Sequence, residues 1–372
     1  MRIPGLLLIM VSLTASITSA QAKTQTKDPR PLRVGVVGLV HDHIHGFFRQ
    51  FLHRTDMEIV GIAEPDQDLA RRIAATYPIK DVPFFRSLDE MLDKAHPQAV
   101  VTYTSTYDHR KVVETCARHG VHVMMEKPLA VSLEDALAIQ KAAAEGHIQV
   151  LVNYETTWYA SNHAAYDLLK AGAIGDLRKF VAHDGHRGPK EIGCSADFLK
   201  WLTDPKLNGA GALFDFGCYG ADLVTWMMDG QRPQTVTAVT QQIKPDVYPK
   251  VDDEATIVLT YPHAQAILQA SWNWPFDRKD IEVYGRTGYA ITVGRDNLRV
   301  REQGNTKERM VEGKPLAAPN EDQISYLRAV VLDGLQPHGL SALDTNVTVM
   351  EILDAARRSA KEGKTIRLPE HR

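Results

Sequence analysis

Short apolar segments that alternate with helical segments between Leu32 and Asn153 constrain the fold of this chain more than any other feature. The first segment, LRVGVVG at 32–38, is almost continuously apolar, which is typical of a strand buried on both faces of a parallel sheet. Similar patterns predict further strands at 58–63, 82–85, 99–103, 122–125 and 149–153, and helices at 66–77, 109–119 and 133–145, the last capped by Ser132. This repeated order of strand and helix predicts a doubly wound parallel sheet of the α/β class.

The sequence pattern changes near Glu155. Segments 235–242, 255–261 and 264–272 alternate apolar and polar residues, as strands with one covered face do. The turn at Pro262-His263 is too short for a crossover, so its flanking strands are expected to run antiparallel. We therefore predict a first domain at 32–154 and a second α/β domain at 155–372, whose neighbouring strands run antiparallel.

The first 31 residues are expected to lie outside both domains. Arg2 precedes a mostly apolar run at 5–15, which is shorter than the roughly 20 residues that span a bilayer. The triplet Ala20-Gln21-Ala22 fits signal-peptidase cleavage. We predict a Sec-type signal peptide at 1–22, a polar linker at 23–31 and a periplasmic or secreted mature protein that is not bound to the membrane. A membrane-anchoring N-terminus is the alternative.

Composition narrows the class of ligand. The formal net charge of -3 offers no electrostatic reason for binding nucleic acid or an anionic membrane. The three cysteines are odd in number and have no short metal-ligand spacing, so no disulfide framework is implied. Small carbohydrate-like molecules remain the expected partners, and aromatic residues that can pack against a sugar ring are present at Trp158, Tyr159, Trp201, Trp272 and Trp274.

Three motifs together resemble the Gfo/Idh/MocA family of oxidoreductases. Gly35-Val36-Val37-Gly38 ends the first strand, Glu126-Lys127-Pro128 follows the fifth, and the stretch from Gly211 to Asp222 carries a spaced Asp215 and Tyr219. The resemblance implies an N-terminal Rossmann domain that binds NAD or NADP, and an α/β domain at 155–372 for substrate binding and oligomerisation, with an open, largely antiparallel sheet. It also implies a reaction in which a hydride moves to or from a carbon of a sugar, polyol or glycoside.

The resemblance places the catalytic and substrate-binding residues at Lys127, Asp215 and Tyr219. Asp215 and Tyr219 are four residues apart and would lie on one face of a helix. Oxidation of an alcohol needs a general base, and we expect the Lys127 ammonium to lower the pKa of Tyr219 so that its phenolate can act. The fork of Arg187 is expected to bind substrate. The alternative reading is a helix cap at Asp215 and a half-buried Tyr219.

The cofactor site is expected at Gly35, Gly38, Val40, His41, His43, Glu64, His109 and Glu126. Glu64 ends the second strand, where an acid can accept both ribose hydroxyls and favours NAD over NADP. Val40 and His43 stand where a pyrophosphate-binding turn has its second and third glycines, so the loop takes another path or holds the cofactor loosely. Export of the chain unfolded is a second argument against free exchange of a cytoplasmic nucleotide.

The histidines of this loop suggest an alternative function. We expect no metal, but His41, His43 and His45 would point to one side of an extended loop, as metal ligands do. In a helix they would fan out instead. The alternative protein has lost dinucleotide exchange and is a carbohydrate-binding protein or a metal-assisted lyase or hydrolase. A homo-oligomer is expected in either case, because an open sheet face needs cover.

Overall fold

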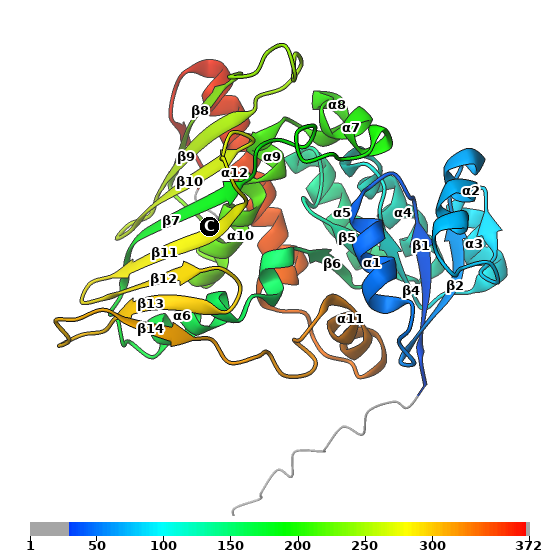
Figure 1. The fold of residues 1–372 in the computed structure, drawn as a ribbon, viewed down its shortest axis with the longest axis horizontal. Coiled ribbons are helices and arrows are strands. Elements are labelled where there is room, and N and C mark those ends of the chain that lie inside the picture. Colours follow the sequence, from blue (N-terminus) through cyan, green and yellow to red (C-terminus); the bar gives the residue numbers. More distant parts are fainter. Residues whose placement is uncertain (1–29, 370–372) are drawn as a thin grey trace, which may run out of the picture.

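The computed structural model describes residues 30–369, so the predicted signal peptide and residues 23–29 of the linker lie outside the described residues. Two α/β units stand side by side, one built on a parallel sheet and the other on a large, mostly antiparallel sheet (Figure 1). Within residues 30–369, no helix combines the length and apolar character that crossing a membrane requires.

The first unit is the predicted doubly wound sheet, which is confirmed. Its six strands follow the order β3-β2-β1-β4-β5-β6, and every adjacent pair is parallel. The order reverses between β1 and β4, and in such sheets ligands bind in the crevice outside the carboxyl ends of these two strands. The strands are β1 (Leu32–Val37), β2 (Met57–Ala63), β3 (Phe84–Phe85), β4 (Ala99–Thr102), β5 (His122–Glu126) and β6 (Val150–Asn153).

Helices connect these strands and cover both faces of the sheet. Ser132 caps the last of them, since its hydroxyl accepts a hydrogen bond from the Asp135 N–H at 3.1 Å. Asp66 caps α2 in the same way, accepting from the N–H groups of Asp68 and Leu69. The helices are α1 (His43–Phe51), α2 (Gln67–Thr76), α3 (Leu88–Ala95), α4 (His109–His119) and α5 (Leu133–Glu145).

The second unit contains the predicted open sheet, of nine strands in the order β14-β13-β12-β11-β7-β10-β9-β8-β15. Within this second sheet, as far as its described strands go, only β7 and β10 pair in parallel. The helices after β7 and then strands β8 and β9 separate the two in sequence, so no hairpin joins them. The strands are β7 (Leu177–Gly185), β8 (Thr235–Gln241), β9 (Glu254–Thr260), β10 (Gln265–Ser271), β11 (Arg278–Gly285), β12 (Tyr289–Val293), β13 (Asn297–Arg301), β14 (Arg309–Glu312) and β15 (Ile366–Arg367).

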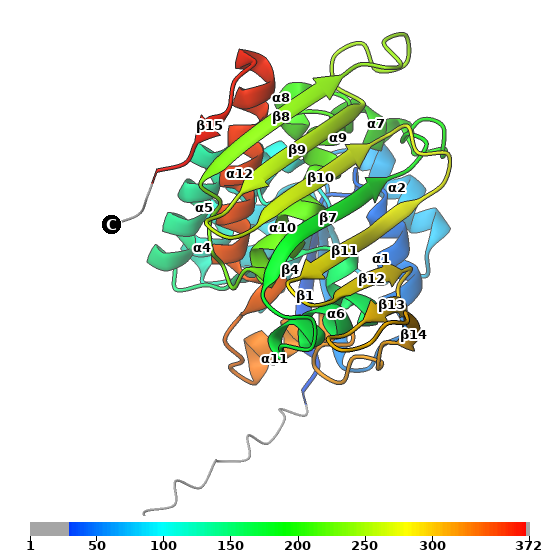
Figure 2. The same cartoon turned by 90° about the vertical axis from the view of Figure 1, so that its left-hand side faces the viewer.

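The two faces of the second sheet differ. Helices α10 (Gly217–Met227) and α12 (Leu343–Glu362) pack on one face, and α6 (Ala160–Lys170) lies beside strands β11 to β13. The opposite face, turned toward the viewer in Figure 2, is covered by no other element of residues 30–369. Its strands accordingly alternate buried and partly exposed residues, as in β9.

Helix α11 (Gln323–Leu332) follows strand β14 of the second sheet in sequence but packs against β1 of the first sheet. Its residues Ile324 and Leu327 belong to the apolar cluster that contains Leu32 of β1 and Phe47 of α1. The first core is therefore completed by residues that lie far beyond the predicted boundary at Glu155, and the chain crosses between the units more than once.

Candidate active site

A buried ion pair joins the two units at the centre of the molecule. Lys127 directly follows β5, and its Nζ lies 2.5 Å from Asp215 Oδ1 and 2.8 Å from the Asp215 carbonyl oxygen. Both side chains are 6% exposed. Trp272, which follows β10 and is fully buried, donates its Nε1–H to Asp215 Oδ2 at 2.9 Å. The carboxylate of Asp215 is thus held on one oxygen by a cation and on the other by an indole.

The expected single helix through Asp215 and Tyr219 is interrupted. Helix α9 (Ala212–Asp215) ends before Phe216, and α10 begins at Gly217. In a continuous helix the Asp215 carbonyl would accept from the Tyr219 N–H. Here that carbonyl accepts from Lys127 Nζ, while the Tyr219 N–H donates to the Phe216 carbonyl at 3.1 Å. Tyr219 nevertheless faces the same cavity as Asp215.

The ion pair between Lys127 and Asp215 changes the pKa expected for Tyr219. Burial opposes charge on Asp215 and Lys127, but their attraction outweighs it, so the pKa of Asp215 is lowered and that of Lys127 is raised. Burial raises the pKa of Tyr219 well above its ordinary value, and Glu155 adds to this. The expectation that Lys127 lowers the pKa of Tyr219 is wrong, because the ammonium lies over the ring face, 5.1 Å from its centroid, and is already paired with Asp215.

A cavity of about 490 Å³ opens beside this pair and is lined by residues of both units. Glu155 forms an ion pair with Lys279 there and accepts a hydrogen bond from the Tyr159 hydroxyl at 2.7 Å. Burial alone would raise the pKa of Glu155, but Lys279 outweighs it and lowers that pKa to about 2. The sequence reasoning missed both residues. Glu155 follows the β6 strand and was detectable by that position, whereas nothing local marks Lys279.

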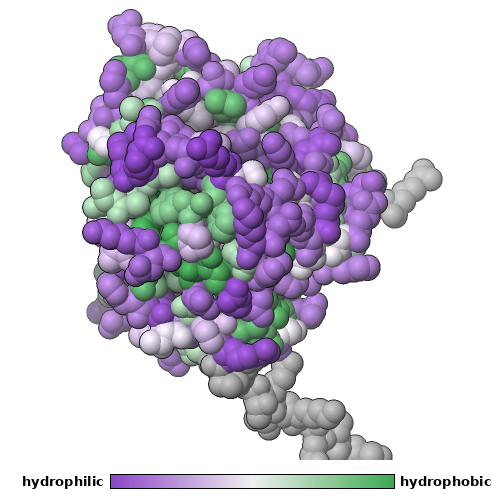
Figure 3. Space-filling model, turned by 90° about the vertical axis from the view of Figure 1, so that its right-hand side faces the viewer, coloured by the Kyte–Doolittle hydropathy of each residue, from purple (hydrophilic) through white to green (hydrophobic). Residues whose placement is uncertain are grey.

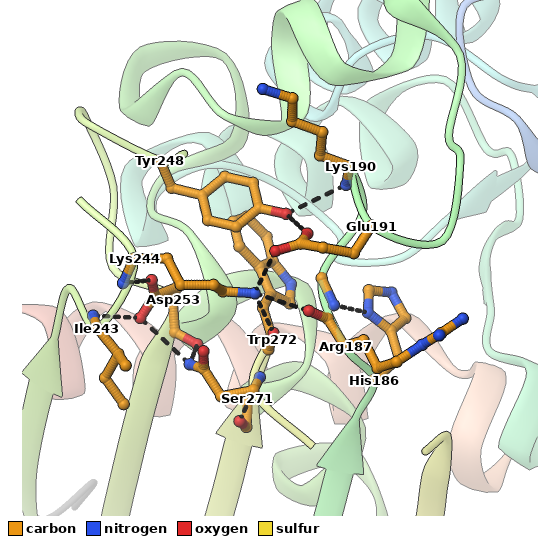
Figure 4. A network of polar contacts seen from close by, with 12 residues as sticks. His186, Arg187, Lys190, Glu191, Ile243, Lys244, Tyr248, Asp253, Ser271 and Trp272 are labelled. Atoms are coloured by element: carbon orange, nitrogen blue, oxygen red, sulfur yellow. Dashed lines mark hydrogen bonds and ion pairs between the residues drawn. The ribbon is translucent and has the colours of Figure 1, made fainter. Parts of the chain in front are cut away.

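The loop after β7 borders the cavity and is anchored by Lys244 (Figure 4). Lys244 Nζ donates to the carbonyl oxygens of Arg187 and Trp272, both at 2.7 Å, and to Glu191 Oε1 at 2.6 Å. His186 lines the cavity, with its Nδ1 accepting from the Gly188 N–H. The side chain of Arg187 is exposed and does not line the cavity, so the expectation that its fork binds substrate is not met: its contribution is a carbonyl oxygen.

The residues at the carboxyl ends of β1 and β2 have features that fit a dinucleotide. Gly38 has a φ of 76°, and a Cβ there would lie 2.6 Å from Thr104 Cγ2, so the turn requires glycine. Glu64 follows β2, is 2% exposed and accepts the backbone N–H groups of Leu39 and Asp66 at 2.8 and 2.9 Å. A carboxylate has about four acceptor sites, so capacity remains for ribose hydroxyls. The strand order, the glycine turn and the acid together fit the cofactor.

Helix α7 (Ala196–Leu202) of the second unit packs against the turn that follows β1. Trp201 Nε1–H donates to the Val40 carbonyl at 3.2 Å, and its ring centroid lies 5.3 Å from that of His41. Ser195, at the start of α7, donates its N–H and hydroxyl to the two oxygens of Asp42 at 2.8 and 2.6 Å. These contacts place the start and end of α7 directly against residues 40–42, the turn that follows β1.

Two residues predicted for the cofactor site, Gly35 and His109, also have a structural role. Gly35 lies inside β1, where a Cβ would meet Met91 Cε at 2.6 Å, so it allows β1 to pack against α3. His109 begins α4 and is 1% exposed. Its Nδ1 lies 3.1 Å from the Pro128 carbonyl and 3.3 Å from that of Leu129, so it positions the chain just after Lys127.

The three loop histidines do not converge. Helix α1 begins at His43, so His45 turns away and its Nδ1 lies 2.8 Å from the Tyr77 hydroxyl. The metal site considered at His41, His43 and His45 is therefore not formed. His41 and His43 remain together with ring centroids 4.4 Å apart, and His43 Nδ1 lies 2.9 Å from Glu126 Oε2. Burial lowers the pKa of His41 well below its ordinary value, and His43 adds to this.

The fold and this site define a Rossmann-type dinucleotide-binding protein with a second unit that closes over the crevice. The profile described as "Oxidoreductase family, NAD-binding Rossmann fold" matches residues 32–154, and the "GFO/IDH/MocA C-terminal domain" profile matches residues 162–291. The chain belongs to the Gfo/Idh/MocA family of oxidoreductases, and its first unit is an NAD-binding Rossmann domain.

Individual relatives agree with this assignment. The chain is 29% identical to the trans-1,2-dihydrobenzene-1,2-diol dehydrogenase of Bos taurus over 238 residues, which span 62% of this chain and 65% of that enzyme. The aldose-aldose oxidoreductase of Caulobacter crescentus, solved with glycerol, has a similar fold, with a TM-score of 0.78 at 22% identity over 91% of this chain and all of that one. An inositol dehydrogenase homolog of Azotobacter vinelandii, solved with NAD+, gives a TM-score of 0.77 at 19% identity over 91% and 98%.

Proposed function

We propose that this protein is an NAD-linked oxidoreductase that transfers a hydride to or from a carbon of a sugar, polyol or glycoside. The observation that carries the proposal is the meeting of Lys127, Asp215 and Tyr219 in one cavity, at the carboxyl end of the Rossmann sheet. The related proteins named above act on diols and aldoses or are solved with polyols, and these share the CH-OH group with the proposed substrates.

We assign proton exchange with the substrate oxygen to Tyr219 and orientation of that oxygen to Lys127. A bound nicotinamide supplies or accepts the hydride. Burial raises the pKa of Tyr219, so its protonated phenol can donate a proton to a carbonyl oxygen that becomes a hydroxyl when the substrate is reduced. Lys127 is fixed by Asp215 and offers its remaining N–H to a substrate in the cavity.

The polar lining of the cavity supports a neutral, polyhydroxylated substrate. The cations Lys127 and Lys279 are each matched by a carboxylate, at Asp215 and Glu155, so no unpaired charge of either sign dominates among these groups. Paired charges present both donors and acceptors, which several hydroxyls of one sugar can use together.

A second candidate keeps the fold but not free exchange of the cofactor. It is supported by helix α7, which closes over His41 and Val40, and by the side chains that replace glycine in the turn. In this form the protein retains a nucleotide permanently, or acts as a carbohydrate-binding protein or metal-assisted lyase or hydrolase without one.

One experiment separates these candidates. The purified protein is denatured, and any released nucleotide is identified by mass and absorbance. The folded protein is then mixed with NAD or NADP and a panel of polyols and aldoses, and reduced nicotinamide is followed by absorbance. Turnover with added NAD supports the exchanging oxidoreductase. Released nucleotide without exchange supports the second candidate. If the protein neither binds added NAD nor turns over any substrate, the proposed oxidoreductase function is contradicted.

We also propose export and self-association. A signal peptide at 1–22 would place the mature protein in the periplasm or outside the cell, where exchange of NAD is limited. Figure 3 shows an apolar area on the Rossmann side of the molecule, bordered by hydrophilic side chains, and Figure 2 shows the uncovered sheet face. Such surfaces favour a homo-oligomer. N-terminal sequencing of the exported protein, with Lys23 expected first, and light scattering would test the two proposals.

A further inference from the structure

We infer that His41, His43 and Glu126 form a binding site for a divalent transition-metal ion such as zinc. One ligand atom from each of the three side chains lies within 4.8 Å of the other two. Two imidazoles and one carboxylate are a common protein donor set for zinc and similar ions. The inference goes beyond the proposed oxidoreductase function and does not depend on it, and it replaces the expectation of no metal.

The carboxylate of the cluster is already oriented. Glu126 is 4% exposed, its Oε2 lies 2.9 Å from His43 Nδ1, and its Oε1 accepts from Asn153 Nδ2 at 3.0 Å. A hydrogen bond from an outer residue to a ligating carboxylate is a regular feature of protein metal sites. Asn153 ends β6, so the outer partner is fixed by the sheet and not by a loop.

The imidazoles need only a small adjustment. Ligands at about 2.0–2.1 Å from a tetrahedral zinc ion stand about 3.3 Å apart, so the three atoms must close by about 1.5 Å at most. His41 Nδ1 accepts a hydrogen bond from the His43 N–H at 3.2 Å. Coordination through either nitrogen of His41 gives up this one bond, because binding at Nε2 moves the ring proton to Nδ1. The opposing cation nearby, Lys127, is already paired with Asp215.

The site has an entrance and an open position. The side chain of His43 is 45% exposed and lines both the 490 Å³ cavity and an adjoining cavity of about 300 Å³. Glu126 lines the smaller cavity. An ion held by three protein ligands keeps a fourth position for water or a substrate oxygen, which is the arrangement of catalytic and not of closed structural zinc sites. Such an ion would also explain why an imidazole, that of His43, stands where dinucleotide-binding proteins have the third glycine of the turn.

The test uses the untagged protein, stripped with a chelator and titrated with Co²⁺ alone in the absence of nucleotide. We expect one equivalent to bind, to give visible absorption bands and to be displaced by Zn²⁺. His43→Ala and Glu126→Gln remove ligands and should weaken binding by more than the roughly 10–100-fold that loss of an outer partner costs. His45→Ala is the matched control, since His45 belongs to the same segment but contacts Tyr77, and it should bind as the wild type does.

Three results would overturn the inference: no stoichiometric Co²⁺ on the wild-type protein, unchanged affinity in His43→Ala, or loss of binding in His45→Ala. Circular dichroism of each variant checks folding. The side chain of His43 is 45% exposed, so we expect His43→Ala to fold. If Glu126→Gln does not fold, the Co²⁺ affinity of His43→Ala decides the test by itself. The readout requires neither nucleotide nor turnover. The proposed oxidoreductase function is tested separately, by titrating NAD into the protein from which metal has been removed, so the two proposals can fail independently.

Discussion

The ion pair between Lys127 and Asp215 permits a quantitative test of the site. Lys127→Met removes the charge and keeps most of the side-chain length, so it leaves the Asp215 carboxylate buried with the Trp272 indole as its remaining side-chain donor. Breaking a buried pair by removing one partner costs about 3–5 kcal/mol of unfolding free energy. The indole donates to a charged group, an interaction of about 1.5–3 kcal/mol that persists in the variant, so we expect the lower half of that range.

Lys279→Met is the matched control. Lys279 pairs with Glu155, but these side chains are 23% and 40% exposed, so solvent screens the pair and we expect a loss of about 1 kcal/mol or less. The free energies of unfolding are obtained from urea titrations followed by circular dichroism. In the double variant Lys127→Met with Asp215→Asn, the loss should be smaller than the sum of the two single losses, because each single variant leaves one buried charge unpaired and the double variant leaves none. Equal losses for Lys127→Met and Lys279→Met, or additive losses in the double variant, would refute the argument.

Three further predictions concern chemistry, cofactor choice and pH. Tyr219→Phe should lower kcat by about 100-fold to 10,000-fold while substrate affinity and folding persist, and a loss under about tenfold would show that the phenol does not exchange the proton. The wild type should bind NAD more tightly than NADP, and Glu64→Ser should narrow the difference in a fluorescence titration of both nucleotides; an unchanged ratio would remove Glu64 from the ribose site. The pKa of Glu155 is about 2 in the folded protein against 4.5 ordinarily, so its contribution to stability is present above about pH 4.5 and is lost as the pH falls toward 2. Lys279→Met should flatten the dependence of the urea midpoint on pH in that window, and parallel curves for the two proteins would contradict the assignment.

Much of the Rossmann unit could be predicted because its signals are local. Helix α5 begins and ends at the predicted residues, since Ser132 caps it and the preceding backbone cannot satisfy its first N–H groups.

In the second unit, the short turn at Pro262-His263 predicted an antiparallel pair of strands, and β9 and β10 pair in that way. The parallel pairing of β7 with β10 was not predictable, because no short turn joins these strands.

The active site depended on contacts that no local pattern records. The spacing of Asp215 and Tyr219 indicated one helical face, but the Lys127 ammonium, 88 residues away, takes the Asp215 carbonyl and the helix is interrupted there. The same pairing removes the free cation that was expected to lower the pKa of Tyr219. The pKa of a buried side chain depends on the charged group paired with it, and the tertiary structure determines that Lys127 pairs with Asp215.

The sequence by itself determined which side chains this protein has available for chemistry: the lysine after β5, the acid and phenol near α10, and the imidazoles of the first loop. Only the tertiary structure decided which of them meet. It turned His45 toward Tyr77 and set Glu126 beside His43, 83 residues away in sequence. The physical reason is that backbone hydrogen bonds and apolar periodicity act over a few residues, whereas an ion pair or a ligand cluster forms wherever packing brings its members within a few ångströms.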